Sequence, residues 1–206
     1  MNPTKSLLTL LVSLLISLAA NANSLEATLA TCATCHGSKG EGNATLFAPA
    51  LAGQRVEYLT RQLRAFKAGV RGEHPGDTHG ATMRGIATGL SQERIGELAT
   101  YFAGLPAAAT PYAGSGKASE GKDLYIATCS ACHGLRAEGY SQLQSPSLRV
   151  LASTDLHAQM KSYVNGWRGA SPQAEQPAVW MNSIANQIID ETQLAHIAAY
   201  IATLSK

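Results

Sequence analysis

The sequence predicts an all-α protein built from two tandem copies of one small domain. A shift of 97 positions, from Cys32 to Cys129, matches many residues of the two halves without a gap, which indicates an internal duplication. Apolar residues recur at helical spacing in both copies, and no stretch shows the sustained alternation of a half-buried strand. The matched pairs include Gly37 with Gly134, Pro49 with Pro146, Gln62 with Gln159 and Arg71 with Arg168.

The chain begins with a segment that is typical of a secretory signal. Lys5 supplies a positive charge, residues 7–20 form a largely apolar run, and Ala20-Asn21-Ala22 resembles a signal-peptidase site. The apolar run is shorter than the roughly 20 residues that cross a membrane. We therefore expect a cleaved signal peptide over residues 1–22 and export to the periplasm, with retention as an anchor as the alternative.

The first copy, residues 23–104, has three regions of helical periodicity. A short helix is expected before Cys32, and Leu59, Leu63 and Phe66 share one face of a middle helix. Ser91 is a favourable N-cap for a final helix. The apolar face of that final helix is formed by Ile95, Leu98, Ala99 and Phe102.

The second copy, residues 117–206, follows a stretch that is typical of a linker. Residues 105–116 contain two prolines, two glycines and several small residues. Beyond them the helical pattern returns, with Ser119 expected to open the helix before Cys129 and Asp190 expected to cap the last helix. The middle helix of this copy carries Leu156, Met160 and Tyr163 on its apolar face.

All four cysteines belong to two Cys-x-x-Cys-His motifs. In this motif two thiols bond to the two vinyl groups of one haem, and the histidine ligates the iron. We therefore expect two covalently attached haem c groups, with one domain folded around each. The predicted haem-binding residues are Cys32, Cys35, Cys129 and Cys132, and the predicted iron ligands are His36 and His133.

Two other chemistries use paired cysteines. A single zinc site usually brings its pairs together over roughly 15–20 residues, whereas 93 residues separate Cys35 from Cys129. Redox disulfides need a βαβ context, which neither motif has. Neither alternative explains a histidine directly after both motifs, so haem attachment is the favoured interpretation.

The sixth iron ligand is expected to be a methionine in each domain. Met83 lies 47 residues after His36, and Met181 lies 48 residues after His133, each shortly before the final helix. A thioether suits ferrous iron and raises the reduction potential. The distance in sequence from histidine to methionine is one residue longer in the second copy. We therefore expect Met181 to lie in a loop that accommodates this extra residue.

Other residues compete for the sixth position. Met160 matches Leu63 in the gapless alignment and is expected in the helix core, away from the iron. His74 and His79 lie in a loop without histidines in the second copy, and they remain alternatives for the first haem. The carbonyl groups of Pro49 and Pro146 are expected to accept the Nδ1–H of the two ligating histidines.

The composition agrees with a cofactor-filled core. The net charge of +2 is close to neutral and therefore does not indicate a nucleic-acid partner. Aromatic residues make up only 6% of the chain. Domains of about 90 residues bury little surface, and a haem would supply apolar volume that the side chains lack.

With these motifs the chain resembles cytochrome c4, a two-domain dihaem class I cytochrome c. The resemblance covers the whole mature chain, and the sequence motifs that carry it lie at residues 32–37, 49–54, 58–63, 69–71 and 90–91, with Met83. It implies two His/Met haems in facing domains and electron transfer from a quinol-oxidising complex to a terminal oxidase. Membrane association would come through these partners.

The resemblance implies an electron carrier and not an enzyme. The alternative is a cytochrome subunit that accepts electrons from a periplasmic dehydrogenase. An enzyme would need an open sixth position, a further cysteine ligand or a substrate pocket, whereas this chain has no fifth cysteine and offers one methionine to each iron.

Overall fold

The computed structural model describes residues 24–108, 114–187 and 190–204. These residues confirm the all-α prediction, because their only sheet-like pairing is an isolated bridge between Asn43 and Ala48. The predicted signal, residues 1–22, and the centre of the predicted linker, residues 109–113, lie outside the described part of the chain. Among the described helices, none is both long and apolar enough to cross a membrane.

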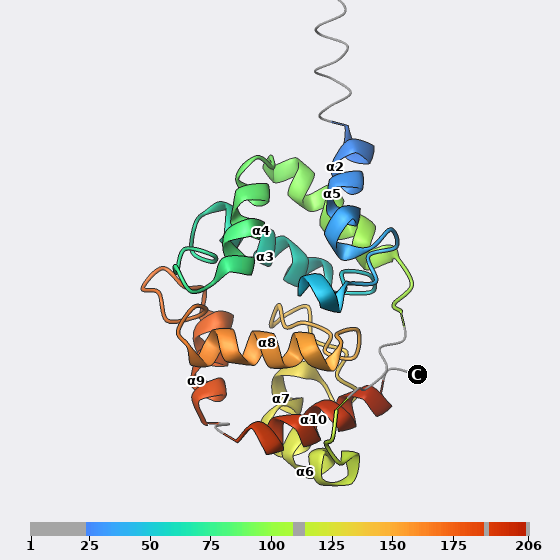
Figure 1. Cartoon of the computed structure of the whole chain (residues 1–206), viewed down its shortest axis with the longest axis vertical. Coiled ribbons are helices and arrows are strands. Elements are labelled where there is room, and N and C mark those ends of the chain that lie inside the picture. The colour runs from blue at the N-terminus through green and yellow to red at the C-terminus, as the bar shows by residue number, and fades with distance from the viewer. Residues whose placement is uncertain (1–23, 109–113, 188–189, 205–206) are drawn as a thin grey trace, which may run out of the picture.

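The first domain contains four α-helices and a short 3₁₀ turn. Its core is formed where α3 packs on α4 and α5, and α2 lies against α5 (Figure 1). Ser24 and Ser91 cap the first and last of these helices, and Asp77 caps α4, because each side chain accepts a backbone N–H of the first turn. The elements are α2 (Leu25–His36), η1 (Ala44–Leu46), α3 (Val56–Lys67), α4 (Thr78–Thr88) and α5 (Gln92–Gly104).

The second domain repeats this order with one helix divided. Its first helix packs across its last so closely at Gly121 that a Cβ there would lie 1.9 Å from the carbonyl oxygen of His196. Asp190 caps the last helix as predicted, but the first begins after Lys117, so Ser119 lies inside it and does not open it. The elements are α6 (Ala118–Thr128), α7 (Ser130–His133), α8 (Ser153–Val164), α9 (Gln176–Gln187) and α10 (Glu191–Thr203).

The two domains face one another through α3 and α8 (Figure 1). Arg71 donates to Gln62 at 2.7 Å and to Gln159 at 2.8 Å, and Arg168 donates to the same two glutamines. We call these four residues the interdomain quartet. It joins the matched positions of the two copies, so the duplication itself supplies an approximately twofold polar contact across the interface.

A second set of contacts flanks the quartet. The side-chain amide of Gln54 donates to the Ser147 carbonyl at 2.9 Å and accepts the Ser147 N–H at 2.6 Å. Arg55 donates to the carbonyls of Glu138 and Gly139. Because these bonds end on the backbone of the segment after the second Cys-x-x-Cys-His motif, they hold that segment against the first domain.

Candidate haem-binding sites

In the first domain, helix α2 ends at the predicted haem motif. The next residue, Gly37, has φ of 82° and ψ of 154°, a conformation that is strained for any residue with a Cβ. The turn buries the imidazole of His36, whose Nδ1 lies 2.8 Å from the carbonyl oxygen of Pro49. A carbonyl can only accept, so Nδ1 carries the proton and Nε2 keeps a lone pair.

The second domain builds the same arrangement on the short helix α7. Gly134 has φ of 84°, and Nδ1 of the buried His133 lies 3.2 Å from the Pro146 carbonyl. Burial lowers the pKa of both His36 and His133, while the proline carbonyls oppose this shift. Both rings are therefore held in the neutral form that binds a metal, and the contacts of Nδ1 with the Pro49 and Pro146 carbonyls are those that the sequence predicted.

None of the four cysteines forms a disulfide in the structure. Burial raises the pKa of Cys129 to about 12, with a smaller contribution from the charge of Cys132, and burial also raises the pKa of Cys32. The first thiol of each motif, Cys32 or Cys129, is thus protonated at neutral pH. This environment is typical of buried thiols and not of a reactive thiolate site.

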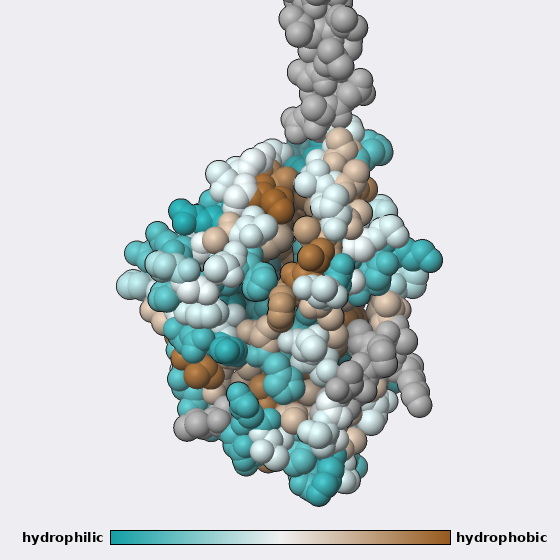
Figure 2. Space-filling view, in the orientation of Figure 1, coloured by the Kyte–Doolittle hydropathy of each residue, from teal (hydrophilic) through white to brown (hydrophobic). Residues whose placement is uncertain are grey.

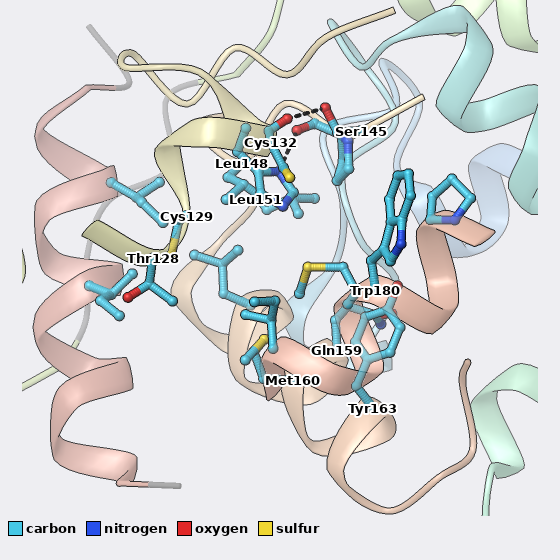
Figure 3. Close-up of a pocket in the computed structure, with 18 of the residues that line it drawn as sticks. Thr128, Cys129, Cys132, Ser145, Leu148, Leu151, Gln159, Met160, Tyr163 and Trp180 are labelled. Atoms are coloured by element: carbon cyan, nitrogen blue, oxygen red, sulfur yellow. Dashed lines mark hydrogen bonds between the residues drawn. The ribbon is translucent and has the colours of Figure 1, made fainter. Parts of the chain in front are cut away.

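A cavity opens beside the second motif, and its shape and lining fit a haem (Figure 3). Cys129, Cys132 and His133 line one part of it, and aliphatic and aromatic side chains from α8, α9 and α10 line most of the remainder. Its empty volume is about 1120 Å³, open mouth included. Two thiols, an unprotonated imidazole nitrogen and an apolar wall around one cavity are the features that a covalent haem requires.

Both candidate methionines of the second domain line this cavity. Met181 lies on α9, and Met160, which the sequence assigned to the core away from the site, lies on α8 and lines the same space (Figure 3). Because α8 directs part of its apolar face into the cavity, Met160 borders the site, and the expectation that it does not reach the iron stays a prediction. Met181 as the ligand remains a prediction.

The methionine of the first domain lies on a helix and not on a loop. Met83 belongs to α4 and packs against the core cluster that also contacts Cys32. Met181 likewise lies within α9, so the loop predicted for Met181 is wrong. Figure 2 shows hydrophobic residues around a hollow on the first-domain half of the molecule.

The alternative histidine ligands contact other aromatic rings. The ring of His79 lies 4.9 Å from that of Phe47, and the ring of His74 stacks at 5.9 Å on Trp167 of the second domain. His74 lies in the loop before α4 as expected, whereas His79 lies in the first turn of α4 and not in a loop.

The polar end of the cavity was missed by the sequence analysis. It is lined by Tyr58 and Arg61 from α3 of the first domain, together with Gln159 and Arg168 of the second. The duplication contained a signal, since Gln159 and Arg168 match Gln62 and Arg71. No sequence signal pointed to Arg61, because its hydrogen-bond partners Glu175 and Gln144 lie more than 80 residues away in the sequence.

Comparison with known proteins gives the family. Residues 24–106 and 118–205 each match the sequence model of the cytochrome c family. The protein belongs to this family. Two cytochrome c domains in tandem imply two covalent haem c groups, and similarity to individual proteins places the chain with the cytochromes c4.

Two relatives and one solved structure define that similarity. The chain is 31% identical over 185 residues to cytochrome c4 of Thiocapsa roseopersicina, covering 85% of this chain and 88% of that protein. It is 33% identical over 153 residues to the thiosulfate dehydrogenase electron acceptor of Thiomonas intermedia (strain K12), covering 69% of this chain and 67% of that protein. The structure of Acidithiobacillus ferrooxidans cytochrome c4 superposes with a TM-score of 0.66 at 27% identity, covering 84% of this chain and 98% of that one.

Proposed function

We propose that this dihaem cytochrome c4-like electron carrier works in the periplasm and holds both irons between a histidine and a methionine. Cys32 and Cys35 would attach the first haem, and Cys129 and Cys132 the second. The iron ligands would be His36 with Met83 and His133 with Met181. The observation that carries this proposal is the cavity in which both thiols, His133 and Met181 face one space.

A bound haem supplies a one-electron couple between ferric and ferrous iron. The residues of this chain would set the reduction potential of that couple. The hydrogen bonds from His36 to Pro49 and from His133 to Pro146 orient each imidazole and increase its basicity as a ligand. The apolar walls keep water from the site, and a methionine in each sixth position would leave no place for a substrate. The chain is therefore proposed as a carrier and not as a catalyst.

Carbon monoxide tests the closed coordination. The reduced protein should bind carbon monoxide slowly and in less than stoichiometric amount near neutral pH, because both axial positions would be filled. The measurement is a carbon monoxide titration followed by visible absorption. Rapid binding of one equivalent per haem would show an open position and would favour an enzymatic role.

For partners, we propose a quinol-oxidising complex as electron donor and a terminal oxidase as acceptor. Export through residues 1–22 would bring the protein to the compartment that these membrane complexes face. Support comes from the resemblance to cytochrome c4 over both domains. Stopped-flow reduction by purified quinol-oxidising complex, followed by oxidation by a terminal oxidase, tests this direction of transfer.

A second candidate donor is a periplasmic dehydrogenase. It is favoured by the relative from Thiomonas intermedia, which is named as the electron acceptor of thiosulfate dehydrogenase. Reduction of this protein by thiosulfate dehydrogenase and thiosulfate, measured beside reduction by the quinol-oxidising complex, separates the two donors. The donor with the larger second-order rate constant at physiological ionic strength is the better partner.

A further inference from the structure

Two arginines provide the charged part of the second-domain cavity. Among the residues that line it, only Arg61 and Arg168 carry a full charge near neutral pH. Their side chains are almost fully buried, with Arg61 7% and Arg168 4% exposed. Arg61 comes from α3 of the first domain, so this cavity is completed by a residue from the other domain.

The guanidinium of Arg61 has one buried donor without an acceptor. One terminal nitrogen of this group lies 3.1 Å from a carboxylate oxygen of Glu175, and the other lies 3.3 Å from the Gln144 carbonyl. Its Nε is buried and has no partner among the described residues. Buried donors of this kind are rarely left unpaired in proteins, and a bound group that supplies an acceptor is one explanation.

The arginines lie where the free edge of a haem would be. Figure 3 shows Cys129 on the opposite side of the cavity from Gln159 and Tyr163, and both of these residues contact Arg168. A haem carries its two vinyl groups toward one edge and its two carboxylates at the opposite edge. Thiols that hold the vinyl edge therefore direct the carboxylates toward the end that Arg61 and Arg168 line.

We propose that Arg61 of the first domain, together with Arg168, binds the carboxylates of the haem in the second domain. This inference rests on the proposed haem attachment at Cys129 and Cys132. Arginine pairs with carboxylates through charge-assisted hydrogen bonds, which are stronger than neutral ones. Arg61 is thus a positioning residue through which the first domain sets the reduction potential of the second haem.

The repeat indicates that the first domain offers an arginine to the second haem and that the second domain offers no matching arginine to the first haem. A shift of 97 positions places Ala158 at the position that matches Arg61, and Asp155 at the position that matches Tyr58. The second domain therefore has no arginine to offer to the first haem from the matching site. A change at Arg61 should consequently alter one haem and leave the other nearly unchanged.

The test is a redox titration of the full-length dihaem protein carrying Arg61→Gln. Loss of the cation leaves the haem carboxylates with less compensation, which favours ferric iron and lowers the reduction potential of one haem. We expect its reduction equilibrium constant to fall about tenfold, equivalent to about 59 mV for one electron. Arg61→Lys keeps the charge and should restore most of the potential.

Arg64→Gln is the matched control. Arg64 lies on the same helix, is exposed and donates to Gln92 at 3.0 Å, so its loss should leave both potentials unchanged. Haem content is measured on every sample by pyridine haemochrome. A protein with fewer than two haems would contradict the proposed function itself. Two haems with both potentials unchanged in Arg61→Gln, or with both lowered equally, would overturn only the role of Arg61.

A free anion is the competing explanation for the unpaired donor. In that case added phosphate at constant ionic strength would shift a potential of the parent protein, and Arg61→Gln would abolish the shift. That pattern would overturn the proposal. A parent potential that is insensitive to phosphate, together with the selective shift in Arg61→Gln, supports it.

Discussion

Replacing Tyr125 with phenylalanine should destabilise the second domain selectively. The Tyr125 side chain is fully buried, and its hydroxyl donates a 2.6 Å hydrogen bond to the carbonyl oxygen of Gly134, directly after His133. Phenylalanine fills the same space but leaves that buried carbonyl without this donor, which costs about 1–3 kcal/mol. In a domain of this size each kcal/mol lowers Tm by about 4–8 °C.

Hydrogen exchange followed by mass spectrometry measures the effect in each domain separately. Peptides from α6, α7 and α10 should exchange faster in Tyr125→Phe, whereas peptides from α3 and α5 should keep their rates. Tyr101→Phe is the matched control, because Tyr101 is 40% exposed and its change should stay within about 0.5 kcal/mol. Unchanged protection of the second domain in Tyr125→Phe would refute the argument that this hydroxyl holds the turn.

Three further perturbations test the ligand assignment, a buried acid and the domain interface. Met181→Ala should abolish the methionine–iron charge-transfer band of one haem and lower its potential, while Met160→Leu, a swap costing under about 1.5 kcal/mol, should leave both haem spectra unchanged; the reverse result would assign the ligand to Met160. Burial raises the pKa of Asp155 above 3.8, so the native state binds the carboxyl proton more tightly than the unfolded state does. The stability that this proton contributes is therefore present below pH 3.8 and is lost as the pH rises through the raised pKa. Asp155→Asn should therefore flatten the dependence of the unfolding free energy on pH in this window. Urea titrations at several pH values measure this dependence, and a variant that keeps the pH dependence of the parent protein would contradict the prediction. Gln54→Ala removes both bonds to Ser147 and should cost about 1–3 kcal/mol in urea unfolding, since two backbone groups lose their partner; an unchanged midpoint would show that the interface does not depend on them.

Features that depend on neighbouring residues could be predicted from the sequence. The caps at Ser91 and Asp190 follow from local hydrogen bonding, which a few consecutive residues determine. The carbonyls of Pro49 and Pro146 could be paired with the histidines because both lie 13 residues after them in the duplicated pattern. The tandem all-α architecture followed from the repeat itself.

Features that depend on packing between distant elements could not be predicted. The sequence placed Met160 in the core because its matched position, Leu63, is apolar, but periodicity does not say that this part of the helix face borders a cavity. It placed Met181 in a loop because the second copy has an extra residue there, whereas the structure extends α9 through this position. Arg61 acts across the domain interface, and no local pattern encodes how two domains dock.

Two covalent haems in one chain are the central feature of this protein, and intact-mass spectrometry measures their number directly. Protein exported from a host that matures c-type cytochromes should, after acid–acetone extraction, have the mass of the mature chain plus two haems. Replacing both Cys129 and Cys132 with serine should remove one haem and leave the haem at Cys32 and Cys35 attached. A parent protein that carries one haem or none after extraction would contradict the attachment of a haem to each Cys-x-x-Cys-His motif.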